Sequence, residues 1–113
     1  MRECVVFYVT YEEALEFTNE MKHQDMNSLQ LNFEEYSAIV SLYGELLSKC
    51  FGFEYEQWID DSSLAVNLTV EGAMKVLNAL HRILMNGNLH IRIIRAVEKI
   101  VRKLSMANIE AHR

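Results

Sequence analysis

The sequence predicts an α+β fold, in which a small sheet of three or four strands packs against about four helices, ending in an antiparallel helical hairpin. Three times along the chain, a short apolar run is followed at once by a helix-capping residue and an amphipathic segment. The chain has no proline and is 50% hydrophobic, which argues against long linkers and disordered tails. With 113 residues, we expect a single domain spanning 1–113.

The first of these units opens the chain. Residues 4–9 are continuously apolar and are β-branched, aromatic or cysteine, which is typical of a strand buried on both faces. Thr10 follows, with Glu13 three residues further on. This spacing is a capping box, in which each side chain satisfies a free backbone N–H of a new helix. We therefore expect a helix over about 11–23.

The second unit begins with apolar residues that alternate with polar ones over 29–33, which predicts a short strand. Asn32 can cap a helix, and Glu35 again lies three residues on. The following segment has a helical apolar period. The sequence thus predicts a helix over about 33–50.

The third unit alternates over 64–68, and Thr69 caps a predicted helix over about 70–86. Alternation over 53–59 and the turn-forming Asp60-Asp61-Ser62 indicate a hairpin from 53–59 to 63–68, with a continued helix as the competing interpretation. At the end of the third helix, Gly87 can adopt the left-handed conformation and Asn88 can cap the last helix.

Both long helices, 33–50 and 70–86, have apolar arcs wider than the roughly 100° typical of a surface helix. Gly44, in the middle of the first, indicates a close approach of another backbone. A homodimer would cover the additional apolar surface. A central position for these helices in a compact monomer explains the arcs equally well.

Charge is distributed unevenly along the chain, whose net charge is −5. Residues 1–80 have a balance of −10 and residues 81–113 a balance of +5. The last helix carries five cations within an arc of about 100°, opposite its apolar side. We call these residues the basic face: Arg92, Arg95, Lys99, Arg102 and Lys103. They suit binding of phosphates or an acidic partner, or they are a solvated surface that complements the first helix, at Glu12, Glu13, Glu16 and Glu20.

A second candidate surface lies at 54–61, which holds four carboxylates, a tyrosine and the single tryptophan. Aromatic side chains anchor protein interfaces, and neighbouring acids steer a basic partner. The predicted partner-binding residues of this acidic aromatic patch are Glu54, Tyr55, Glu56, Trp58, Asp60 and Asp61. If Trp58 instead packs into the core, the segment is a strand with one polar face.

Motifs for catalysis and cofactor binding are not evident in the sequence. The four glycines are isolated, and the two cysteines and four histidines lack the spacing of zinc ligands. We therefore expect no enzymatic activity, no cofactor and no bound metal. The two cysteines, the absence of an export signal and the lack of a long apolar run predict a cytoplasmic protein with reduced thiols and no membrane partner.

Together these features predict a small acidic cytoplasmic protein that binds a partner protein and regulates or inhibits it. The acidic aromatic patch would cover a basic surface of that partner, such as a nucleic-acid-binding groove. The alternatives are direct nucleic-acid binding through the basic face, and a structural subunit of a larger complex.

Overall fold

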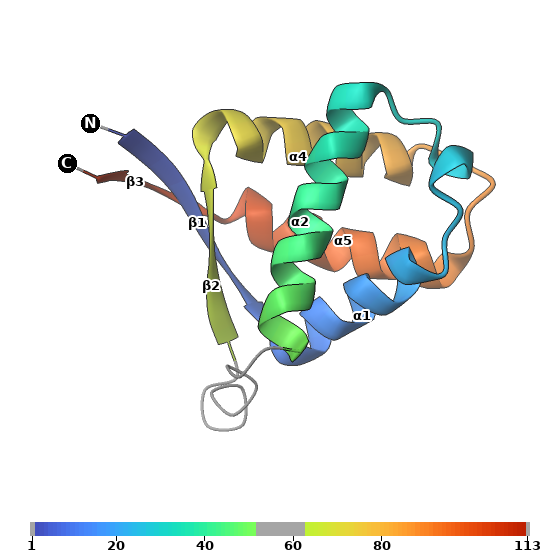
Figure 1. Ribbon diagram of the computed structural model, residues 1–113, viewed down its shortest axis with the longest axis horizontal. Coiled ribbons are helices and arrows are strands. Elements are labelled where there is room, and N and C mark those ends of the chain that lie inside the picture. Colours follow the sequence, from blue (N-terminus) through green and yellow to red (C-terminus); the bar gives the residue numbers. More distant parts are fainter. Residues whose placement is uncertain (1, 52–62, 113) are drawn as a thin grey trace.

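The computed structural model describes residues 2–51 and 63–112, and it confirms the α+β class (Figure 1). The first apolar run and its capping residue give a strand followed directly by a helix, as expected. The elements in chain order are β1 (Arg2–Thr10), α1 (Tyr11–Lys22), the short 3-10 helix η1 (Met26–Leu29), α2 (Phe33–Phe51), β2 (Ser63–Thr69), α4 (Val70–Leu84), α5 (Ile91–Ser105) and β3 (Asn108–His112).

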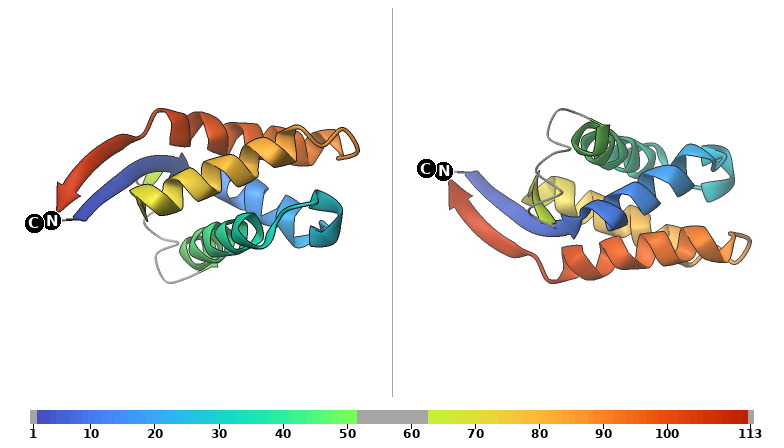
Figure 2. Two further views of the ribbon diagram at one scale, coloured as in Figure 1. Left: turned by 90° about the horizontal axis from the view of Figure 1, so that it is seen from above. Right: turned by 90° about the horizontal axis from the view of Figure 1, so that it is seen from below.

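β1 is the central strand of an antiparallel sheet with the order β2-β1-β3. Phe7 pairs with Val66 of β2, and Val5 pairs with Ile109 of β3. The helices gather on one side of this sheet (Figure 2). The expectation of a strand buried on both faces holds only in part. On the face of β1 that points away from the helices, Val6 is 6% exposed but Tyr8 is 54% exposed.

Three capping predictions are confirmed. Thr10 and Glu13 form the complete capping box of α1, and the Thr69 hydroxyl accepts from the backbone N–H of Gly72 at the start of α4. At the start of α2, Asn32 N donates to Glu35 Oε1 (3.0 Å) and Glu35 N donates to Asn32 Oδ1 (2.8 Å). Each cap satisfies backbone groups that the first helical turn leaves free.

The strand predicted over 29–33 is absent. Leu29 ends η1, Gln30 adopts a left-handed conformation with φ 57°, and α2 begins at Phe33. The apolar alternation has another cause, because Leu29 is fully buried in the core whereas Phe33 is 83% exposed on the helix surface. Two residues that lie on different elements produced a pattern that resembles one strand.

The helical hairpin is present but does not end the chain, since β3 follows α5 and joins the sheet. The linker also differs from the prediction. His90, not Asn88, caps α5, and its Nδ1 accepts from Arg92 N (3.1 Å). Gly87 does not have a positive φ. Asn86 instead fixes the turn, because its Oδ1 accepts from the backbone N–H of Asn88 (3.0 Å).

The core lies between the sheet and the helices, and the two long helices use it differently. α4 places most of its apolar arc on the core, with five buried residues and further half-buried ones packed against them, while Met74 is 61% exposed. α2 buries only its inner side, including Ile39, Leu42 and Leu46. Figure 2 shows α2 as the outermost layer on the side opposite α5. The wide arc of α4 is thus explained within the monomer, whereas that of α2 is not.

Gly44 does not mark a close backbone approach within the chain. It is exposed on α2, and a Cβ atom at this position would have no described atom within 4 Å. No helix within residues 2–51 and 63–112 combines the length and apolarity that a membrane span requires.

Candidate functional site

The acidic aromatic patch lies outside the described residues, so Glu54, Tyr55, Glu56, Trp58, Asp60 and Asp61 remain a sequence prediction. Of the predicted hairpin, only the second strand is described, as β2. The other strand, over 53–59, and the turn that joins it to β2 also lie outside these residues.

The basic face of α5 is partly neutralised by α1, which runs beside it. Lys99 Nζ lies 2.7 Å from Glu16 Oε2, and Lys103 Nζ lies 3.7 Å from Glu13 Oε1. Figures 1 and 2 show the two helices adjacent along their lengths. These pairs are half-buried, so both lysines are held on the protein. Both glutamates belong to the acidic set of the first helix that complements the basic face.

The three arginines of the basic face remain directed to solvent. Arg92 and Arg102 have side chains that are 72% and 73% exposed, and each lies 3.9 Å from a carboxylate, of Glu20 and Glu98 respectively. Such long, exposed pairs contribute little to stability. Arg95 has no ion-pair partner within the parts of the chain that the structure describes. The basic face therefore presents three exposed arginines, of which Arg95 alone has no ion pair within the described residues.

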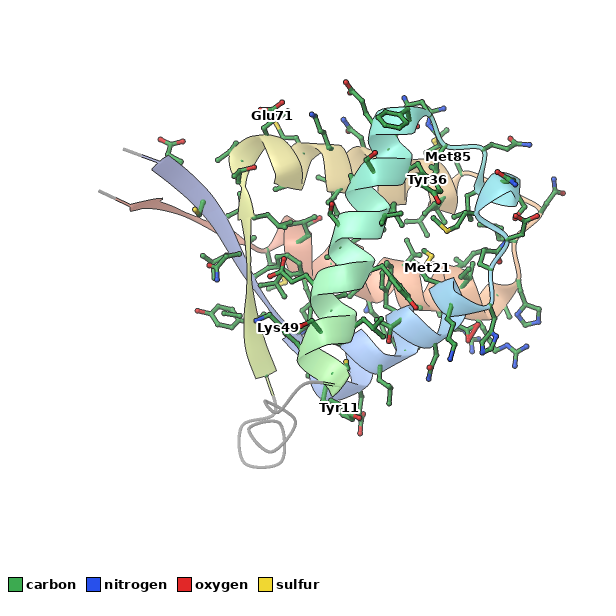
Figure 3. All side chains as sticks on the ribbon, viewed as in Figure 1. Tyr11, Met21, Tyr36, Lys49, Glu71 and Met85 are labelled. Atoms are coloured by element: carbon green, nitrogen blue, oxygen red, sulfur yellow. The ribbon has the colours of Figure 1, made fainter. Side chains whose placement is uncertain are left out.

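A polar cavity of about 640 Å³ lies between the start of α2 and the part of α4 that begins at Lys75. η1 and the turn after it contribute Leu29 and Gln30 to its lining. Carboxylates line it from α2, and cations line it from α4. Figure 3 shows Met85, which belongs to the lining, at the C-terminal end of α4.

The wall of the cavity contains an ion pair between Glu35 and Arg82. Glu35 is 7% exposed, and its Oε2 accepts from Arg82 Nε at 2.8 Å, while Oε1 accepts from the backbone N–H of Asn32. The Asn32 N–H and the Arg82 guanidinium stabilise the charged carboxylate and lower the pKa of Glu35, against the opposing effect of burial. One carboxylate thus caps α2 and joins it to α4.

This pair makes a testable contribution to stability against acid. Because the pKa of Glu35 is lowered on folding, its contribution is fully present above the ordinary value near 4.5 and is lost as pH falls through the folded-state pKa. We expect Glu35→Gln to be less stable than wild type at neutral pH, with a difference that shrinks in acid. Urea unfolding at a series of pH values measures this. A difference that stays constant or grows toward low pH would contradict the assignment. Glu34→Gln, one residue away and exposed, is the matched control for loss of one negative charge near the start of α2.

The outer side of α2 is an apolar surface without charge. Phe33, Tyr36 and Val40 are 83%, 41% and 45% exposed, and their spacing places them on one helix face. Gly44 continues the same face. Beside it, an apolar groove of about 310 Å³ separates α2 from the end of α1 and η1, lined by Met21, Met26, Ile39, Val40 and Tyr43, with Lys22 and Gln24 also contributing. We call Phe33, Tyr36, Val40 and this groove the α2 face.

The cysteines show no sign of activation among the described residues. Both Cys4 and Cys50 are free thiols, and burial raises the pKa of Cys50. A raised pKa favours the protonated, unreactive form. Within 2–51 and 63–112, no three His, Cys, Asp or Glu side chains come together in a way that could hold a metal ion.

Sequence reasoning missed the cavity because its key contact joins residues 47 positions apart. The sequence predicts a capping role for Glu35 and gives no sign of a role for Arg82. The α2 face had a visible signal in the wide apolar arc, although the sequence did not show which part of that arc stays exposed. Compared with known proteins, the chain gives no significant match to a protein family, to a curated protein or to a solved structure.

Proposed function

We propose that this protein acts by binding a partner protein and covering part of its surface, as a regulator or inhibitor. The observation that carries the proposal is the α2 face, where a fully helical segment keeps large apolar side chains in solvent. Contiguous exposed apolar surface is a mark of interaction sites in folded domains. The proposal requires no catalytic group.

The chemistry of the α2 face favours a protein partner over nucleic acid. Phe33 and Tyr36 are the kind of aromatic side chain that anchors protein interfaces. The adjoining groove contains Met21 and Met26, whose flexible side chains adapt to an inserted apolar group. Binding of a phosphate backbone depends instead on Lys and Arg. Phe33, Tyr36, Val40 and Gly44 carry no charge.

The rest of the molecule supports a basic partner in a reducing compartment. The net charge of −5 favours association with a positively charged surface. The acidic aromatic patch predicted at 54–61 would add to this attraction. The two thiols are free, which suits the cytoplasm. We therefore infer a cytoplasmic protein whose partner offers an apolar anchor surrounded by basic residues.

The test compares two pairs of substitutions that add the same charge. Phe33→Asp with Val40→Asp changes the α2 face, whereas Met74→Asp with Met106→Asp changes apolar residues that are 61% and 80% exposed elsewhere. Each protein is immobilised and the amount of captured partner is measured. We expect wild type and the control pair to retain the same partner, and the α2 pair to retain at least tenfold less of it. Its retention should weaken as salt rises.

Two results would contradict the proposal. One is equal capture by the α2 pair and by wild type. The other is a wild-type protein that has the mass of a dimer in solution while the α2 pair has the mass of a monomer. A second copy of the chain would then occupy the α2 face. Circular dichroism of each variant confirms that the fold is kept.

Nucleic-acid binding through α5 is the second candidate, and the exposure of Arg92, Arg95 and Arg102 favours it. It ranks second because Lys99 and Lys103 are held by glutamates of α1. The overall negative charge also opposes association with phosphates.

A further inference from the structure

The polar cavity has a volume and a frame that suit a small ligand. Its volume of about 640 Å³ lies within the range of small-molecule sites. Two contacts between distant parts of the chain hold its walls. Arg82 Nε donates to Glu35 Oε2, and Asn86 Nδ2 donates to the backbone oxygen of Ser28 at 3.0 Å. The cavity is therefore formed before any ligand arrives.

Arg82 is held in place yet keeps most of its donors. Its Nε is bonded to Glu35, whose second oxygen is bonded to Asn32 N, so the carboxylate cannot turn away without losing a contact. The Nη groups of Arg82 have no hydrogen-bond partner in the described part of the chain, and its side chain is 57% exposed. Four N–H donors on a fixed plane are suited to a carboxylate.

The two walls carry opposite charge. Lys75, Asn78 and Arg82 are spaced to lie on one face of α4, and all three line the cavity. Among the described residues, Lys75 forms an ion pair only with the exposed Glu71, at 3.2 Å, so it can turn toward a ligand at little cost. On the α2 wall, Glu34 lines the cavity, is exposed and has no ion-pair partner among the described residues.

We propose that this cavity binds a small zwitterion of the amino-acid type, with its carboxylate on Arg82 and Lys75 and its ammonium on Glu34. Besides His81, two carboxylates and two cations line the cavity and balance each other, so a ligand without net charge is matched and a dianion is not. Met85, which is 85% exposed, supplies an apolar part of the lining that would contact an aliphatic side chain. This ligand is independent of the partner protein proposed for the α2 face.

The experiment titrates the full chain, labelled with ¹⁵N, with L-leucine, N-acetyl-leucine and leucinamide. We expect leucine to give saturable NMR shifts at the Arg82 side chain and at Asn78. The two analogues each lack one charge, so each loses a charge-assisted hydrogen bond. We expect each to bind at least about tenfold more weakly than leucine. Absence of a saturable shift with leucine, or shifts confined to other residues, would overturn the proposal. Equal binding of N-acetyl-leucine would also overturn it, since the site would then recognise an anion only.

Variants separate the cavity from general charge effects. Glu34→Gln and Lys75→Gln are surface changes expected to weaken leucine binding about tenfold each. Glu71→Gln removes the same charge as Glu34→Gln and frees Lys75, but it lies outside the cavity lining. It should bind leucine at least as well as wild type. Wild-type affinity in Glu34→Gln, or equal weakening in Glu71→Gln, would refute the assignment.

Discussion

Replacing Phe7 by alanine is expected to lower the free energy of unfolding by about 3–5 kcal/mol. Phe7 is 1% exposed in the middle of the central strand, where it belongs to the core between sheet and helices. Removing the ring leaves a cavity that well-packed neighbours fill only in part. Urea unfolding monitored by circular dichroism measures the change.

Tyr8→Ala is the matched control, because Tyr8 is the next residue on β1 and is 54% exposed on the opposite face. We expect a loss of no more than about 1 kcal/mol, the range of strand propensities. If Phe7→Ala fails to fold, Phe7→Leu keeps most of the volume and should cost about 1 kcal/mol. Equal losses for Phe7→Ala and Tyr8→Ala would mean that the sheet is covered on both faces.

Leu42→Ala is expected to cost about 2–5 kcal/mol, because Leu42 is fully buried on the inner side of α2. Val40, two residues earlier, is 45% exposed on the α2 face. Val40→Ala should therefore change the free energy of unfolding by less than about 1 kcal/mol. Thermal or urea unfolding of both variants measures how α2 is divided between core and surface.

This pair also separates folding from binding. Val40→Ala should weaken partner capture while stability is nearly kept, whereas Leu42→Ala should reduce stability without removing a residue of the α2 face. A large loss of stability in Val40→Ala at a concentration where the protein is monomeric would show that the residue belongs to the core. The α2 face would then lose its central apolar residue.

Sequence reasoning was most reliable where a structure depends on neighbouring residues. The capping pairs Thr10 with Glu13 and Asn32 with Glu35 lie three positions apart, and both act as expected. It was least reliable where a pattern of a few residues had two physical causes. The alternation over 29–33 resembled a strand although Leu29 packs in the core and Phe33 lies on a helix surface.

Other features depend on contacts between distant segments, which a single sequence does not reveal. The sequence does not predict β3, because the place of this strand in the sheet depends on its pairing with β1. That pairing joins residues as far apart in the chain as Arg2 and His112. For the basic face of α5, the sequence allows either a binding surface for phosphates or an acidic partner, or a surface that complements the glutamates of α1. The structure shows the second of these at Lys99 and Lys103, and leaves the arginines of the basic face in solvent.

The sequence by itself determined where α1, α2 and α4 begin and which side chains are apolar, because caps and periodicity act within one or two turns. Only the tertiary structure decided which apolar side chains are covered and which charges meet. Phe33 and Leu42 are both apolar residues of α2, yet one is exposed and the other buried, since neighbouring elements cover just one side of that helix. Likewise, Glu35 and Arg82 form one site only because α2 packs on α4.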